Sequence, residues 1–167
     1  MTTAPLVVGI DGSDASARAL RWALAEALHR AAPVVAIMVW ESHAVLAGPA
    51  PLLMHPELAP REVHQRHQQD LDRVVSACLA GTTNPDVQVE LVEGDTVDTL
   101  VDRSAEAAML VLGDRGRSRV TEVLGGTALH CVHKARCPVL IVPSGMDLGR
   151  RATATDVHPV TRDPILG

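Results

Sequence analysis

The sequence predicts one α/β domain built on a parallel sheet, and three observations lead to this prediction. Short apolar runs alternate with amphipathic segments of helical spacing, which gives the order βαβαβαβαβ. The run Val34–Trp40 is apolar throughout, as in a parallel strand covered on both faces. A length of 167 residues suits one domain with a substantial core, and no break in composition indicates a second. We therefore expect a doubly wound sheet with helices on both faces.

The first strand and the first helix are separated by a sharp turn. Leu6–Ile10 is a short apolar strand that ends at Asp11-Gly12-Ser13. Ser13 is well placed as the N-cap of the helix, because serine side chains accept hydrogen bonds from the free N–H groups of a first turn. The apolar positions then recur at helical spacing from about Asp14 to Ala31, and Pro33 ends the helix before the second strand.

The segment Glu41–Pro60 contains four prolines and no sustained period, so we expect a long loop beside the ligand end of the sheet. The next helix is predicted over about Arg61–Ala80. His64 and His67 lie three positions apart on it and could share a metal ion, but no cysteine or carboxylate cluster with ligand spacing accompanies them. A solvated helix face is the favoured interpretation.

The second half of the chain supplies three more strands. Val87–Glu93 alternates apolar and polar residues, which indicates a half-exposed strand at a sheet edge. Gly94-Asp95-Thr96 then caps a helix. Met109–Leu112 and Val139–Val142 are both wholly apolar, and a helix that starts at Gly126-Thr127 separates them.

The stretch between these last two strands predicts a phosphate-binding site. Gly113 and Gly116 let the backbone turn with its N–H groups exposed. Gly126 and Thr127 open the following helix, whose free N–H groups and positive dipole end attract anions. Arg115 and two further arginines make the loop basic within an acidic chain, which favours a polyphosphate ligand. The alternative is that the glycines only shape a turn and the arginines form a solvated face.

These pieces resemble the universal stress protein family, whose ATP-binding members carry the spacing G-2x-G-9x-G-(S/T). Gly113, Gly116, Gly126 and Thr127 fit this spacing. Val7–Ser13 is similar to the first strand of the family and Cys137–Val142 to the last. The resemblance implies the strand order 3-2-1-4-5, a fold of the adenine nucleotide alpha-hydrolase-like kind, and a universal stress protein domain over residues 1–143. Residues 144–167 have no apolar period, and we expect a disordered tail there.

In such a fold the ligand binds in the crevice between the first and fourth strands. By resemblance Asp11 would meet the ribose side of the nucleotide, although it could instead only form a turn. Asp114 stands where family members usually carry a small hydroxyl or similar residue. A carboxylate there repels phosphates unless it points away or helps to hold a divalent cation. The nucleotide-contacting positions that the resemblance implies are Gly9, Asp11, Val39, Leu112, Gly113, Arg115, Gly116, Gly126, Thr127 and Ala128.

The resemblance implies a stress-response regulator that holds ATP as a signal, with Mg²⁺ as an open addition. Two alternatives stay open: a slow ATPase or ATP-pyrophosphatase-like enzyme of related fold, and a nucleotide-free dimeric scaffold. No catalytic residue is assigned, because neither G-x-S-x-G nor H-E-x-x-H occurs. A P-loop is excluded, since the only lysine, Lys134, does not follow a glycine-rich turn.

Composition and charge limit the possible partners and the cellular compartment. The net charge is −5, Phe and Tyr are absent, and no Lys/Arg-rich run occurs, so we expect no nucleic-acid partner. The three cysteines are widely spaced, which indicates reduced, packed thiols of a cytoplasmic protein. Because neither a basic N-terminal region with a long apolar run nor a stretch of about 18 apolar residues occurs, we expect no membrane partner.

The final strand predicts a homodimer. In the implied order one sheet edge is Val87–Glu93, which carries two glutamates, whereas the other edge has no charge at all. An unprotected edge exposes unpaired N–H and C=O groups that a second copy could pair with about a two-fold axis. The predicted contact residues are Val139, Leu140, Ile141 and Val142.

Overall fold

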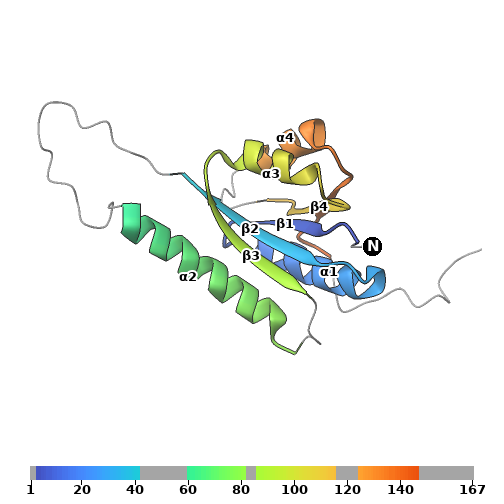
Figure 1. Ribbon diagram of the computed structural model, residues 1–167, viewed down its shortest axis with the longest axis horizontal. Coiled ribbons are helices and arrows are strands. Elements are labelled where there is room, and N and C mark those ends of the chain that lie inside the picture. The colour runs from blue at the N-terminus through green and yellow to red at the C-terminus, as the bar shows by residue number, and fades with distance from the viewer. Residues whose placement is uncertain (1–2, 42–59, 82–85, 116–123, 147–167) are drawn as a thin grey trace, which may run out of the picture.

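A computed structural model of the chain describes residues 3–41, 60–81, 86–115 and 124–146 (Figure 1). Strands and helices alternate along these residues, as the apolar pattern predicts. The expected loop over Glu41–Pro60 falls almost wholly outside the described residues. The elements are β1 Leu6–Ile10, α1 Asp14–Arg30, β2 Val34–Trp40, α2 Pro60–Leu79, β3 Val87–Glu93, α3 Thr96–Ser104, β4 Met109–Gly113, α4 Gly126–Lys134 and β5 Val139–Val142.

The five strands form one parallel sheet in the order β3-β2-β1-β4-β5, which confirms the predicted topology. β1 is central, since Leu6 pairs with Val34 of β2 on one side and with Met109 of β4 on the other. β3 and β5 are the two edges. The order reverses between β1 and β4, so a crevice opens at the carboxyl ends of these two strands.

The helices cover both faces of the sheet: α1 and α2 lie on one face, and α3 and α4 on the other (Figure 1). Each face has its own core. Leu20 and Leu71 belong to the cluster under α1 and α2, whereas Leu100 and Cys131 belong to the cluster under α3 and α4. Residues of β2 alternate between the two clusters, which explains why this strand is apolar at consecutive positions.

The helix ends follow from local chemistry. The hydroxyl of Ser13 accepts a hydrogen bond from the Ser16 amide at 3.2 Å and caps α1, as predicted. α1 closes with Ala31 in the left-handed conformation, at φ 48°. α2 begins at Pro60, one residue before the predicted start. Proline suits a first helical position, because its φ is fixed near the helical value and its missing N–H would have no acceptor there.

His64 and His67 differ from the prediction of a purely solvated helix face. Both rings lie against Trp40, with centroid distances of 5.5 Å for His64 and 6.4 Å for His67. Trp40 is buried at the end of β2 beneath α2, so this helix face covers an aromatic ring. Within the described ranges, no three His, Cys, Asp or Glu side chains are grouped closely enough to hold a metal ion.

The three cysteines are free thiols, and their packing agrees with the prediction. Cys78 lies in the core under α2, and its Sγ is 3.5 Å from the Ala17 carbonyl oxygen. Cys131 is fully buried on the opposite face of the sheet. Burial raises the pKa of both thiols, so they stay protonated and unreactive at neutral pH. Among the described helices, none has the length and apolar character needed to span a membrane.

Candidate functional site

A cavity of about 250 Å³ opens at the carboxyl ends of β1, β2 and β4, on the sheet face that α3 and α4 cover. The first turns of α1, α3 and α4 close its sides. Of the ten predicted site residues, Gly116 lies outside the described residues. The other nine all line this cavity: Gly9, Asp11, Val39, Leu112, Gly113, Arg115, Gly126, Thr127 and Ala128.

The N-terminus of α4 gives the cavity a row of hydrogen-bond donors. The first hydrogen bond of this helix runs from the Leu129 amide to the Gly125 carbonyl oxygen at 2.9 Å. The amides of Gly126, Thr127 and Ala128 precede it, so they have no acceptor within the helix. No side chain caps this end, since the N-cap residue is Gly125. These amides and the positive end of the helix dipole form an anion-binding surface.

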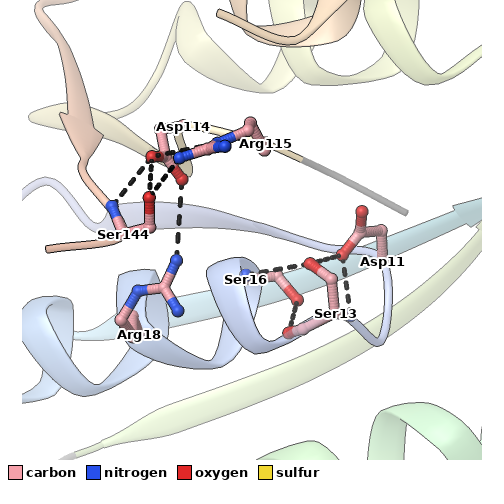
Figure 2. A network of polar contacts seen from close by, with 7 residues as sticks. All are labelled: Asp11, Ser13, Ser16, Arg18, Asp114, Arg115 and Ser144. Carbon is pink, nitrogen blue, oxygen red and sulfur yellow. Dashed lines mark hydrogen bonds and ion pairs between the residues drawn. The ribbon is translucent and has the colours of Figure 1, made fainter. Parts of the chain in front are cut away.

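Asp11 forms the turn that is one of the two alternatives left open by the sequence, and it also lies at the cavity. Its Oδ1 accepts hydrogen bonds from the Ser13 amide at 2.9 Å and the Ser13 hydroxyl at 2.5 Å, which makes the predicted turn (Figure 2). Gly12 provides this turn with a φ of 82°. Asp11 also lines the cavity, so the turn itself places the carboxylate there. A ribose contact through this carboxylate stays a prediction.

Asp114 does not line the cavity. Its Oδ2 accepts hydrogen bonds from the amide of Ser144 at 2.8 Å and the hydroxyl of Ser144 at 2.7 Å (Figure 2). Of the three possibilities stated for this carboxylate, the structure therefore shows that it points away. Ser144 was expected to begin a disordered tail, but this contact holds it in a turn directly after β5. Residues 147–167 lie outside the described residues.

The charge of Asp114 is balanced by two guanidinium groups. Arg18 Nη2 lies 3.6 Å from Oδ1, and Arg115 Nε lies 3.6 Å from Oδ2. Burial alone would raise the pKa of Asp114. The Ser144 hydroxyl and amide, together with the two guanidinium groups, outweigh this effect and hold the pKa below its usual value. The carboxylate is therefore ionised at neutral pH.

The packing of Gly113 against α1 supplies a further reason for glycine at this position. Gly113 does not adopt a positive φ, so a left-handed backbone is not what requires glycine here. Instead, a Cβ atom on Gly113 would lie 2.7 Å from the carbonyl carbon of Ala15 and 2.7 Å from its Cβ. The end of β4 thus touches the backbone of α1, and no residue larger than glycine fits between them.

Seven cavity residues were absent from the predicted set. Ser13, Ser16 and Thr96 begin helices that follow β1 and β3, and this position after a parallel strand is the sequence signal that could have found them. Ile37 lies two residues before Val39 and therefore on the same face of the sheet. Ile10, Leu100 and Gly125 complete the lining.

Comparison with known proteins shows the family. The model of the universal stress protein family matches residues 3–143, and the chain belongs to this family. It is 35% identical over 139 residues to a universal stress protein of Mycolicibacterium smegmatis, which covers 82% of this chain and 47% of that protein. It is 31% identical over 147 residues to one of Mycobacterium tuberculosis, with 87% and 50% covered. The chain spans about half the length of the curated relatives that it matches.

Solved structures agree with the fold. The universal stress protein UspA of Lactobacillus plantarum superposes with a TM-score of 0.68 at 25% identity, covering 85% of this chain and 99% of that chain. A universal stress protein solved in complex with cAMP has a TM-score of 0.61 at 26% identity, covering 84% and 98%. That protein therefore binds an adenine nucleotide.

Proposed function

We propose that this protein is an ATP-binding regulator of the stress response that acts in the cytoplasm. The observation that carries the proposal is the cavity at the β1 and β4 ends, where nine residues of the family pattern meet. Its walls are largely apolar, with Ile37, Val39 and Leu112 on the strands, as suits an adenine ring. Its polar groups are concentrated at the first turns of helices.

The position of the donors supports a nucleotide over an uncharged ligand. The free amides at the start of α4 lie at this cavity, and Arg115 is one of its lining residues, with its guanidinium group on Ser144 and Asp114. Both bind phosphate oxygens, the amides through the helix dipole and the guanidinium through its charge. The cAMP complex of a relative at 26% identity adds support for an adenine nucleotide.

Mg²⁺ would reach this site through the ligand. Asp114 faces Ser144 and Arg18 and does not line the cavity. Asp11 is the one carboxylate among the described lining residues. Mg²⁺ is often held by one carboxylate together with substrate phosphates, so this lining fits a cation that arrives with ATP. One carboxylate is too few to form a Mg²⁺ site from protein groups alone.

The test is titration calorimetry of the purified protein with ATP, cAMP and adenosine, each with and without Mg²⁺. The proposal predicts that ATP binds, and that adenosine, which has no phosphate, binds more weakly by about tenfold or more, which corresponds to about 1.4 kcal/mol. Assay of the same samples for released phosphate separates a regulator from a slow ATPase. If no adenine compound binds, the nucleotide-free scaffold is the better description.

We further propose a homodimer through the outer side of β5. The carbonyl oxygens of Pro138 and Val142 accept hydrogen bonds from the amides of Leu110 in β4 and Asp114 just after it, at 2.9 and 3.2 Å. In a parallel ladder the residues between them alternate, so the N–H and C=O groups of Val139 and Ile141 point away from the sheet. No strand of the described chain pairs with this side of β5. The same strand of a second copy could satisfy these groups.

The dimer is tested by removing one outward N–H group. Ile141→Pro deletes the Ile141 donor, whereas Ile141→Val keeps it and serves as the matched control. A charge at this position is a poorer test, because the side chain of Ile141 packs against the core under α3 and α4. We expect light scattering to give a dimer for the parent and Ile141→Val, and a monomer for Ile141→Pro with unchanged circular dichroism. A monomeric parent at micromolar concentration would exclude this interface.

A further inference from the structure

Asp114 lies between partners on two separate elements. On one side Oδ2 accepts both hydrogen bonds from Ser144, the second residue after β5. On the other side Oδ1 faces Arg18 of α1 across 3.6 Å, a distance too long for a hydrogen bond (Figure 2). The carboxylate is thus hydrogen-bonded to the chain after β5, whereas its contact with α1 is a longer ion pair.

The contact between Asp114 and Arg18 is incomplete. Asp114 Oδ1 and Arg18 Nε are both buried, and neither has a hydrogen-bond partner in the described part of the chain. Buried polar atoms without partners are costly and rare, so each calls for an explanation. A small movement of the carboxylate toward Arg18 would turn the 3.6 Å approach into a charge-assisted hydrogen bond. Such a movement would give the carboxylate a second position, hydrogen-bonded to α1 instead of Ser144.

Arg115 connects this carboxylate to the cavity. Its Nη2 donates to the Ser144 hydroxyl at 2.6 Å and its Nε lies 3.6 Å from Asp114 Oδ2, while the residue also lines the cavity. The side chain is 44% exposed and can reorient. A phosphate that takes this guanidinium removes a hydrogen bond from Ser144 and one neighbouring cation from Asp114. Arg18 is then the remaining cation near the carboxylate.

We propose that Asp114 is a two-position switch that couples the cavity to the chain after β5. With the cavity empty, Asp114 and Arg115 hold Ser144. When a polyphosphate occupies the cavity, Arg115 turns to the phosphates, Asp114 moves to Arg18, and Ser144 is released. The inference rests on the proposed nucleotide function and names its output, which is the release of the turn at Ser144 after β5. A ligand shifts such an equilibrium only through contacts that differ between the two states, so a nucleoside without phosphates leaves the switch unchanged.

The test is hydrogen exchange of the Ser144 amide, followed by NMR in the full chain. This amide donates to Asp114 in the resting position, so its release exposes it to solvent. We expect saturating ATP to speed its exchange by about fivefold, as for the loss of one hydrogen bond, and saturating adenosine to leave it unchanged. An equal effect of ATP and adenosine, or no effect of ATP, would overturn the switch.

A pair of variants on α1 tests the second position. Arg18→Met removes the group that receives the carboxylate, and Arg21→Met removes an exposed arginine of the same helix as a control. We expect ATP to lose its effect on Ser144 exchange in Arg18→Met and to keep it in Arg21→Met. The same effect in both variants would contradict a role for Arg18. Calorimetry on the same samples reports binding separately, so a protein that binds ATP without freeing Ser144 refutes the switch alone, whereas a parent without nucleotide binding refutes the proposed function.

Discussion

Gly126→Val should weaken ATP binding by about a hundredfold, or about 3 kcal/mol, without unfolding the protein. Gly126 opens α4 and lines the cavity, and a Cβ atom built on it meets no atom within 4 Å. The added side chain therefore fits the fold. It does not fit a phosphate, because it covers the first-turn amides of α4 that would bind one.

The loss of affinity should follow the size of the added side chain and the charge of the ligand. Gly126→Ala adds one carbon and should lie between the parent and Gly126→Val. Adenosine has no phosphates to bind the first-turn amides of α4. The substitution should therefore lower its affinity much less than that of ATP. Ala77→Val adds branched carbons at an exposed position of α2, on the other face of the sheet, and should change neither. Equal ATP affinities for Gly126→Val and Ala77→Val in calorimetry would remove the α4 N-terminus from the site.

The strands could be predicted because burial on both faces leaves a direct mark on the sequence. A strand such as β2 that meets helices on either side must be apolar at consecutive positions, and Val34–Trp40 is. β3 lies at an edge and alternates instead. The order of the wholly apolar strands leaves no such mark, because any pairing among them buries similar area. It came from the family resemblance, and the structure confirms it.

The candidate site was predictable where it depends on local backbone and not where it depends on distant contacts. Gly126 and Thr127 mark a helix start that can be recognised within a few residues of sequence. The direction of the Asp114 side chain depends on Ser144, thirty residues further on, and on Arg18 of the first helix. A carboxylate in a phosphate loop looks repulsive until these partners are known. Ser144 itself belongs to no periodic pattern, so its ordered position could not be inferred.

Gly113 and Gly9 show that two glycines of one site can tolerate substitution very differently. A Cβ on Gly9 would lie 2.6 Å from Leu112 Cδ2, and a Cβ on Gly113 would lie 2.7 Å from Ala15. The distances are similar, but the atoms differ. Cδ2 is the end of a side chain that borders the cavity and can rotate into it. Ala15 presents the backbone of α1, which is held in place by the buried core beneath the helix.

Gly113→Ala should therefore destabilise the protein by about 3 kcal/mol or more, whereas Gly9→Ala should cost about 1 kcal/mol. The first substitution forces α1 away from β4, and neither element can yield without opening the packing between them. The second requires only that Leu112 change its rotamer. Urea denaturation of the ligand-free proteins measures both values without any assumption about nucleotide. If the two variants lose the same free energy of unfolding, the contact between the end of β4 and the α1 backbone does not limit residue 113 to glycine.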